Sequence, residues 1–259
     1  MGEPAAITLK DVSKRFGGGP RALDRVSLEV RPREFLAVVG ASGSGKTTFL
    51  RLINRLSAPS EGTLRIGGSD AAELDPIALR RRMGYVFQEV GLFPHMTVAE
   101  NIAITPRLLG WDEARRAARV EELLELVRLP PDYRGRFPNQ LSGGERQRIG
   151  VARALAAHPD IVLMDEPFAA LDPPTRDALG QDYRALHETL GLTTVMITHD
   201  MLEALGLADR IAVLSAGRVI AHGTPAALIE HEHAYVRELM QTPRRVAERV
   251  SALIAARER

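Results

Sequence analysis

Cysteine is absent from this 259-residue sequence. Its absence excludes disulfide bonds, zinc–thiolate sites and thiol nucleophiles, and it agrees with a reducing cytoplasm. The sequence also lacks an apolar run long enough to span a bilayer, and its N-terminus lacks the basic-then-apolar layout of a signal peptide. We therefore expect a soluble chain that meets a membrane only through another subunit.

An excess of charge of either sign is missing as well. The sequence has 34 basic and 33 acidic residues, interspersed along the chain, and a formal net charge of +1. Because this balance gives no basic footprint for nucleic acid, we expect no nucleic-acid partner. Lysine is scarce, since the only lysines are Lys10, Lys14 and Lys46. We expect the compact ammonium group of Lys46 to have a chemical role at its position in the sequence.

Beyond about residue 158, strand and helix patterns alternate regularly. Apolar runs at 161–167, 193–200 and 210–214 alternate with helical patterns at 172–191 and 200–208. This alternation predicts a parallel sheet with helices on both faces. The protein is therefore expected to belong to the α/β class.

The earlier part of the chain has a different pattern of expected secondary structure. Up to about residue 70, short strand patterns surround one helix expected at 49–56, where Phe49, Leu50, Ile53 and Leu56 repeat at helical spacing. The following stretch, up to 158, is mostly helical. The other expected elements are strands at 6–16, 25–30, 34–40 and 63–68, helices at 75–83, 97–104, 111–129 and after Ser142, a hairpin at 215–223, and a last helix at 243–256 with Val246, Val250, Leu253 and Ile254 on one stripe.

A phosphate-binding pattern lies between the third expected strand and the first expected helix. Residues 40–47 read GASGSGKT and fit GxxxxGK(S/T). The loop amides would surround phosphates, Lys46 would reach the outer phosphates, and the Thr47 hydroxyl would bind Mg²⁺. A glycine-rich turn with an exposed lysine is the alternative, but the strand and helix on either side favour the phosphate loop. The candidate nucleotide-binding residues here are Gly40, Ser42, Gly43, Ser44, Gly45, Lys46, Thr47 and Thr48.

Polar residues follow three further strand patterns. Asp165 and Glu166 end one apolar strand, at the edge where ligands bind in open α/β sheets. Asp165 suits the Mg²⁺ shell through water, and Glu166 is placed to polarise an attacking water. His199 ends another strand and is expected to contact a γ-phosphate, although a lone histidine is more often structural. Gln88, after the strand-like MGYVF, can offer an amide oxygen to Mg²⁺ or water.

Ser142 and Glu145 form a capping box for the helix that follows them. Capping alone does not explain Gly143 and Gly144, because each glycine in the first helical turn costs roughly 0.8–1 kcal/mol relative to alanine. Their bare backbone would let an anion approach the positive end of the helix dipole. A glycine-rich helix start with no lysine of its own looks like half of a phosphate site, so a second copy is expected to complete it.

These motifs together resemble the nucleotide-binding subunit of ABC transporters. The resemblance rests on GASGSGKTT, Gln88, LSGGERQR, IVLMDEP, ALD at 170–172 and His199, in this order, and covers about residues 7–230. It implies a P-loop (RecA-like) parallel sheet core with an N-terminal antiparallel β subdomain and an inserted α-helical subdomain. The implied domains are an ATPase domain at 1–230, with its helical part at about 90–158, and a C-terminal helical extension at 231–259.

The resemblance also implies roles for individual residues. The segment 142–145 would clamp the γ-phosphate of ATP held by the opposite subunit, and Asp172 would lie in a loop that communicates between the two sites. Gln88 and the segment after it would touch a membrane subunit. Phe16 would stack on adenine, although from the sequence alone it is as consistent with a place in the core.

A narrower resemblance is to ATPase subunits of importers for glycine betaine, choline, carnitine and related osmoprotectants. It rests on FQEVGLFPHMTVAENIAITPRLLGW, DEPFAALDPPTRDAL and FPNQLSGGERQR. Many members of that group carry a C-terminal pair of regulatory CBS domains, which 259 residues are too few to hold beside an ATPase domain. This departure loosens both the assignment of the solute and any expectation of regulation by such domains.

The resulting expectation is an ATP- and Mg²⁺-dependent ATPase homodimer at the cytoplasmic face of the cell membrane. It would energise uptake of a small solute through permease subunits. An extracytoplasmic solute-binding protein would deliver the solute to these subunits. The alternatives are an exporter subunit and a soluble ABC ATPase without a permease. Kinases and GTPases of other phosphate-loop families leave SGGE and ALD unexplained.

Overall fold

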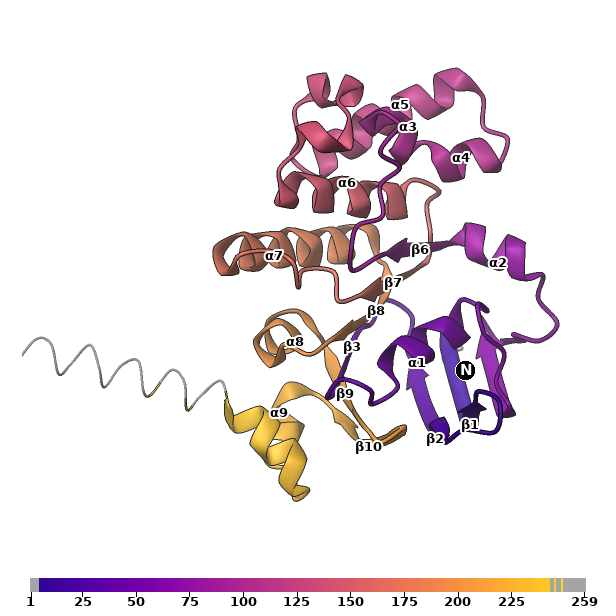
Figure 1. The fold of residues 1–259 in the computed structure, drawn as a ribbon, viewed down its shortest axis with the longest axis vertical. Coiled ribbons are helices and arrows are strands. Elements are labelled where there is room, and N and C mark those ends of the chain that lie inside the picture. The colour runs from indigo at the N-terminus through magenta and orange to yellow at the C-terminus, as the bar shows by residue number, and fades with distance from the viewer. Residues whose placement is uncertain (1–4, 243–244, 246–247, 249–259) are drawn as a thin grey trace, which may run out of the picture.

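The computed structural model describes residues 5–242, 245 and 248, and they form two β-sheets flanked by helices (Figure 1). Most of the last helix expected from the sequence, at 243–256, lies outside the described residues, and so does its apolar stripe. No helix within the described residues has the length and apolar character needed to cross a bilayer.

The first sheet is antiparallel. It contains β1 (Ile7–Arg15), β2 (Arg21–Val30), β4 (Glu61–Ile66) and β5 (Ser69–Asp70), in the order β2-β1-β4-β5. Alternate residues of these strands are buried, as expected for a sheet with one face on the core. This sheet is the N-terminal antiparallel subdomain that the family resemblance implied.

The second sheet has six strands in the order β10-β9-β3-β8-β7-β6. All pairs except β9 with β10 are parallel. The strands are β3 (Phe35–Val39), β6 (Met83–Val86), β7 (Ile161–Asp165), β8 (Thr193–Thr198), β9 (Arg210–Ser215) and β10 (Arg218–Gly223). The antiparallel β9–β10 pair is the hairpin expected at 215–223.

The central strand β3 separates two apolar cores. Phe35, Ala37 and Val39 pack into a core shared with the helices on one face, whereas Leu36 and Val38 pack into the core of the antiparallel sheet and α1 (Lys46–Ile53). Both faces of the strand are buried, which is why its sequence is continuously apolar. The parallel core with two covered faces is therefore confirmed.

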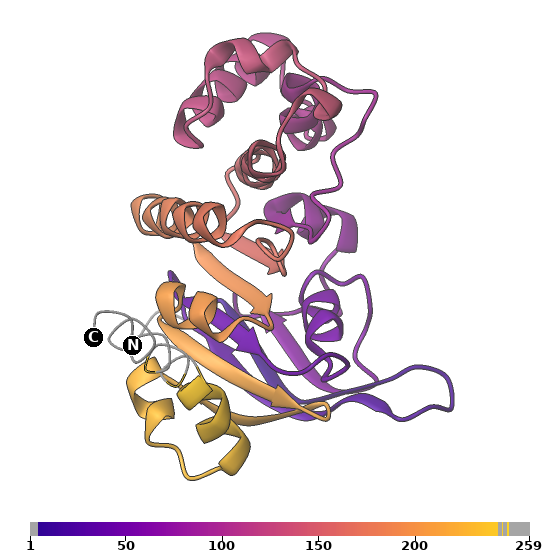
Figure 2. The ribbon, with the colours of Figure 1, turned by 60° about the vertical axis from the view of Figure 1, so that its left-hand side comes forward.

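The inserted helical region stands at one end of the molecule, at the top of Figure 1, and a 60° turn shows it as a separate layer above the sheet (Figure 2). It follows α2 (Pro76–Arg82) and β6. Its helices are α3 (Val98–Ile102), α4 (Ile104–Leu108), α5 (Glu113–Leu126) and α6 (Gly143–Leu155), with 3-10 turns at Pro131–Gly135 and Pro138–Gln140. The later helices are α7 (Pro173–Leu190), α8 (Met201–Leu207) and α9 (Pro225–Ile229).

One local prediction was wrong. The helix expected at 49–56 begins at Lys46 and ends at Ile53, and Arg55 adopts a positive φ of 54°. A residue in this left-handed conformation cannot continue a right-handed helix. Leu56 therefore does not share the buried face of Phe49 and Ile53, and its side chain is 58% exposed.

Candidate functional site

The candidate site lies where three neighbouring parallel strands end. Val39 at the end of β3 pairs with Thr198 of β8, and Asp165 at the end of β7 pairs with Ile197. The segments that follow these strands therefore start at one edge of the sheet, where α/β proteins bind ligands. The sequence prediction that residues 40–47, 165–166 and 199 share this edge is confirmed.

Two glycines permit the close turn of the phosphate loop. A Cβ on Gly40 would lie 2.1 Å from the Leu214 carbonyl oxygen. Gly45 has a φ of 109°, and a Cβ there would lie 2.5 Å from the Ala22 carbonyl oxygen. Any side chain at either position would collide with rigid backbone, so the loop needs glycine at both ends.

Lys46 points back into the loop from the first turn of α1. Its Nζ donates to the carbonyl oxygens of Gly40, at 2.7 Å, and Ala41, at 3.1 Å, and the residue is only 7% exposed. Burial lowers the pKa of Lys46, while the negative charges of Glu166 and Asp165 act in the opposite direction. A buried ammonium held by two neutral carbonyls keeps capacity for a strong anionic partner.

The loop contains a second polar group without a matched partner. The Ser44 Oγ is buried and has no hydrogen-bond partner among the described residues. An unsatisfied buried hydroxyl is costly, and it calls for a ligand or a water. Together with the Lys46 ammonium and the bare backbone of the glycines, it fits the oxygen-rich surface of a polyphosphate. In the same loop Ser42, Gly43 and Thr47 are exposed, and Thr48 is half-buried.

Asp165 is held by a tyrosine that no sequence motif points to. The Tyr85 hydroxyl, from β6, donates to Asp165 Oδ2 at 3.3 Å. Burial raises the pKa of Asp165, and the hydrogen bond from Tyr85 opposes that rise. Burial also raises the pKa of Tyr85, so its hydroxyl stays protonated and can only act as the donor here.

Glu166 and His199 contact each other directly. His199 Nδ1 lies 2.9 Å from Glu166 Oε2, and the Glu166 backbone N–H donates to the Ile197 carbonyl at 2.9 Å. Because a carboxylate only accepts hydrogen bonds, Nδ1 must carry the proton in this contact. Nε2 of His199 then faces away as an acceptor in the neutral ring and as a donor in the imidazolium ion. Glu166 has a φ of 44°, which turns its side chain out of the strand.

The candidate magnesium ligands do not form a metal site by themselves. Thr47 and Gln88 are exposed, and Asp165 is half-buried. No group of three or more His, Cys, Asp or Glu side chains in the described part of the chain is arranged to hold a metal. Mg²⁺ commonly takes only one or two protein ligands beside phosphate oxygens and water, so a hydroxyl and a carboxylate beside the phosphate loop fit this ion.

The segment Ser142–Glu145 opens α6, as expected. The Ser142 hydroxyl accepts from the Glu145 N–H at 3.3 Å, and the Ser142 N–H donates to Glu145 Oε2 at 2.7 Å. The Tyr133 hydroxyl donates to the other carboxylate oxygen at 2.5 Å, and these bonds hold the pKa of Glu145 below its usual value. The capping box thus fixes Glu145 as an anion and leaves the two glycines between it and Ser142 at the helix start.

Two outlying candidates are also placed by the structure. Asp172 is the N-cap of α7 and accepts from the Thr175 N–H at 3.2 Å. Phe16 lies just beyond β1, is 53% exposed, and has Lys14 Nζ at 4.9 Å from its ring centre. Since so much of the ring is exposed, the core alternative for Phe16 is excluded.

The two halves of the candidate site belong to different parts of the fold. Residues 40–47 lie with the two sheets, whereas 142–145 lie in the helical region above them (Figure 1). Among the hydrogen bonds and ion pairs of the described residues, none joins one segment to the other. Within one chain, the helix start at 142–145 is therefore not bonded to the phosphate loop.

Residues 23–169 match the family model described as ABC transporter. The chain belongs to the ABC transporter family. It is 52% identical over 219 residues to the choline transport ATP-binding protein OpuBA of Bacillus subtilis, covering 85% of this chain and 58% of that protein. It is 48% identical over 223 residues to the sulfate/thiosulfate import ATP-binding protein CysA of Caulobacter vibrioides, covering 85% of this chain and 65% of that protein. The chain thus spans about three fifths of the length of these relatives.

A solved structure of another ABC cassette supports the fold assignment. The ATP-binding cassette MJ0796, in a dimeric post-hydrolysis state bound to ADP and Pi, has a TM-score of 0.76 and 36% identity, covering 84% of this chain and 98% of that chain. Further relatives named for glycine betaine, carnitine, choline or osmoprotectant transport are 45–48% identical. The expected ABC cassette fold is confirmed.

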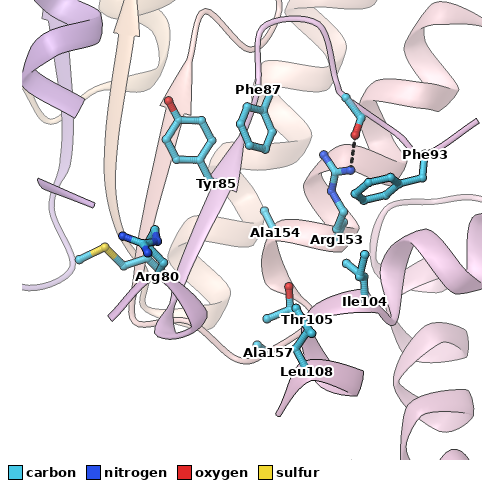
Figure 3. A pocket seen from close by; sticks show the side chains of 12 residues that line it. Arg80, Tyr85, Phe87, Phe93, Ile104, Thr105, Leu108, Arg153, Ala154 and Ala157 are labelled. Atoms are coloured by element: carbon cyan, nitrogen blue, oxygen red, sulfur yellow. Dashed lines mark hydrogen bonds between the residues drawn. The ribbon is translucent and has the colours of Figure 1, made fainter. Parts of the chain in front are cut away.

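An apolar groove of about 460 Å³ opens at the segment that contains Gln88, since Phe87 and Gly91 on either side of that residue line the groove (Figure 3). It lies between β6, α4 and α6. Phe87, Phe93 and Leu108 line it and are all largely exposed. Arg153 donates to the carbonyl oxygens of Val90 and Gly91 and thereby holds the chain that borders the groove. Burial lowers the pKa of Arg153 to about 10.

A buried asparagine fixes the other side of this segment. Asn101 donates to the carbonyls of Phe93, Met96 and Thr97 at 3.0–3.2 Å and accepts from the Phe93 N–H at 2.8 Å. Sequence reasoning missed Asn101, Tyr85 and Tyr133, because none of the three belongs to a recognised motif. Tyr85 and Tyr133 bond to the motif residues Asp165 and Glu145, but only the folded chain brings them together.

Proposed function

We propose that the chain is the ATP-binding and ATP-hydrolysing subunit of an ABC importer. The observation that carries the proposal is the phosphate loop at the sheet edge, with buried Lys46 and the hydrogen-bonded Glu166–His199 pair beside it. Membership of the ABC transporter family and the ADP-bound state of the MJ0796 dimer support a nucleotide as the ligand. The assignments of individual site residues follow from their positions.

Two copies would bind two ATP molecules, each between residues 40–48 of one copy and 142–145 of the other. The helix start at 142–145 offers bare amides and a dipole to phosphate but no cation. Lys46 offers the cation, and within its own chain it has no bond to that helix start. Dimeric MJ0796 supports this pairing of copies.

Within each site, Glu166 would orient and polarise the attacking water, and His199 would contact the γ-phosphate. The hydrogen bond from His199 to Oε2 fixes one carboxylate oxygen and leaves Oε1 for the water. His199 can donate to a phosphate oxygen through Nε2 in its imidazolium form, since Nδ1 is committed to Glu166. Phe16 would stack on the adenine base.

Mg²⁺ would be held by Thr47 and, through water, Asp165, with Gln88 contributing an amide oxygen. When bound, this ion neutralises charge on the β- and γ-phosphates. The hydrogen bond from Tyr85 to Asp165 Oδ2 would help to hold the carboxylate for this role. Gln88 follows Phe87, the first residue after β6, so a change at the ion and a change in the groove lined by Phe87 would involve the same short segment.

The groove beside Gln88 would receive a segment of the permease subunit. Its exposed Phe87, Phe93 and Leu108 form an apolar surface whose backbone is fixed by Arg153 and Asn101. A preformed apolar surface of this kind suits a short amphipathic helix. Docking there would place the dimer at the cytoplasmic face of the membrane, with an extracytoplasmic binding protein delivering the solute to the permease.

The solute is proposed to be a quaternary amine or related osmoprotectant. The 52% identity to the choline transport protein favours this choice. The identity to the sulfate/thiosulfate protein is slightly lower, at 48%. Co-purification of the permease and binding protein, followed by ligand binding to the latter, tests it. Tight binding of choline, carnitine or glycine betaine is expected, and tight binding of an anion such as sulfate would refute the assignment.

Replacing Lys46 tests the ATPase itself. Lys46→Ala should raise the Kd for ATP roughly 10- to 100-fold, because it removes a charge-assisted bond to phosphate in a buried site. Titration with a fluorescent ATP analogue measures this. Lys10→Ala, an exposed lysine of β1, is the matched control and should leave the affinity unchanged. Equal affinity of Lys46→Ala and the wild type would refute the phosphate-loop assignment.

A further inference from the structure

The loop that contains Asp172 and the turn that contains His199 are joined by one arginine. Arg176, the fourth residue of α7, donates from Nη2 to the Leu171 carbonyl at 2.9 Å and from Nη1 to Asp200 Oδ2, also at 2.9 Å. One planar guanidinium therefore contacts both segments at once. Lysine lacks this planar fork, so its ammonium group would not hold the two acceptors in the same fixed geometry.

Asp200 is itself tied closely to the His199 turn. Its Oδ1 accepts from the Leu202 N–H at 2.9 Å and the Glu203 N–H at 3.4 Å, which caps α8. Its backbone N–H donates to Thr198 Oγ1 at 3.0 Å. Movement of Asp200 thus moves both residues next to it, and His199 is one of them.

These bonds form a continuous path. It runs from the carbonyl before Asp172, through the Arg176 side chain, to Asp200, and from the adjoining His199 to Glu166. Through the proposed function, one end of the path would face the ATP of the partner copy and the other end the ATP of its own copy. Bonded networks with two arrangements are a physical means of coupling two sites.

A groove of about 370 Å³ between α7 and α8 runs along this path. Arg176 and Glu203 line it, and among the described residues the buried atoms Arg176 Nε and Glu203 Oε1 have no hydrogen-bond partner. The unpaired Arg176 donor and the unpaired Glu203 acceptor can find partners in more than one arrangement of α7 and α8, for example through water. The contact between α7 and α8 can therefore rearrange without breaking a closed network.

We propose that Arg176 is a positioning residue that couples the Asp172 loop to the His199 turn, so that engagement of one ATP site sets the geometry of the other. The inference rests on the proposed function, because it presupposes two ATP sites in a dimer. Arg176 itself contacts no substrate in this account. It acts through Asp200 and His199.

The test is the rate and cooperativity of ATP hydrolysis by the full chain with Arg176→Gln. The kcat should fall by roughly 5-fold or more, and the Hill coefficient for ATP should fall toward one, with the KM within about twofold of the wild type. Asp200→Asn keeps a good helix cap but removes the ion pair, and should give the same pattern. The double variant should be no worse than either single variant.

The chain contains a matched control. Arg184, two turns further along α7, donates to the Leu207 carbonyl at 3.0 Å and to Asp209 Oδ1 at 2.8 Å, at the far end of α8. Arg184→Gln breaks the same kind of bond pair away from the site, and should keep the wild-type kcat and Hill coefficient. Arg176→Lys keeps the charge alone and should recover only part of the rate.

The outcomes separate this inference from the proposed function. A wild-type protein that hydrolyses no ATP would refute the function. An active wild type whose Arg176→Gln variant keeps the full rate and Hill coefficient would refute only the coupling. Equal losses in Arg176→Gln and Arg184→Gln would also refute it, since both would then reflect general loosening of α7. If Arg176→Gln fails to fold, Asp200→Asn gives the same decision.

Discussion

The phosphate-loop region and the helix start at 142–145 both place glycine-rich backbone at the start of a helix, but they differ in the charged groups that they contain. Around the phosphate loop, Lys46 donates to loop carbonyls and Glu166 contacts His199 within one chain. At the other region, the side chains of Ser142 and Glu145 bond to the backbone N–H groups of one another, and Glu145 also accepts from Tyr133. The first region contains the cation and the candidate catalytic groups, and the second contains bare amides and an anion locked into a cap.

This difference indicates which region depends on a partner. The phosphate loop has unused capacity in Lys46 and Ser44, and it can bind an anion within one chain. The helix start has a dipole and open backbone, but its negative Glu145 would weaken binding of a free anion. It is therefore suited to an ATP molecule already held by Lys46 of a second copy.

The largest expected effect comes from separating binding from hydrolysis in the first region. Glu166→Gln should lower the ATPase rate by roughly 100-fold or more, because the amide cannot polarise water as a carboxylate does. ATP would still bind, so gel filtration with ATP and Mg²⁺ should show a stable dimer. A variant that remains monomeric under these conditions would contradict completion of the site between copies.

A smaller effect is expected in the second region, where one substitution should raise the stability of the fold and lower the ATPase rate. A Cβ on Gly143 would meet only Leu171 Cδ2, at an ordinary 3.8 Å, and the residue opens α6. Gly143→Ala should therefore stabilise the fold by roughly 0.5–1 kcal/mol. It should also lower the ATPase rate by about 10-fold, because the methyl group blocks close approach of a phosphate.

Thermal unfolding and ATPase assays together decide the role of Gly143. Gly135 is exposed and has open space at its Cβ position, so Gly135→Ala serves as the control with normal activity. A Gly143→Ala variant that is both more stable and fully active would show that this position only caps a helix. That result would contradict a phosphate-binding role for the helix start at 142–145.

Phe16 is the residue proposed to stack on the nucleotide base. Phe16→Ala should weaken ATP binding by about 1 kcal/mol, roughly fivefold in Kd, through loss of stacking on the base. Stability should change little because the ring is mostly exposed. Phe137→Ala, an exposed phenylalanine before the helix start, is the control. The stacking assignment fails if the two variants bind ATP equally well.

The two regions should also differ in their response to pH. Burial raises the pKa of Glu203, on α8 near His199, from 4.5 to about 7, with Asp200 also raising it and Arg176, His199 and a Thr198 hydrogen bond lowering it. Its neutral form is therefore favoured by folding, and this stability is complete below pH 4.5 and lost as pH rises through 7. Glu145 has a lowered pKa and behaves in the opposite sense, since its contribution is lost as pH falls.

Glu203→Gln imitates the neutral carboxyl group and isolates this effect. The variant should gain stability relative to the wild type on the order of 1 kcal/mol at pH 8, and little at pH 4. Denaturant unfolding at the two pH values measures the difference. Glu188→Gln, on the exposed surface of α7, is the control with no such gain. An equal effect of Glu203→Gln at both pH values would show that its ionisation is not linked to folding.

The sequence predicted the parts of the site that depend on local pattern. The loop 40–47, the acidic strand end at 165–166 and His199 follow from strands whose ends must share an edge. Partners brought together by tertiary packing, such as Tyr85 with Asp165, leave no local pattern and could not be found. Leu56 shows the same limit, because its helical spacing continues past a residue whose positive φ ends the helix.

The most direct test of completion between two copies uses the absence of cysteine. Ser42→Cys and Ser142→Cys are made in separate chains, each also with Glu166→Gln, and mixed with ATP and Mg²⁺ before mild oxidation. A disulfide-linked dimer in the mixture, dependent on ATP and absent from either variant alone, is the predicted result. An ATP-dependent disulfide within a single chain that holds both cysteines, with no linked dimer in the mixture, would contradict the account.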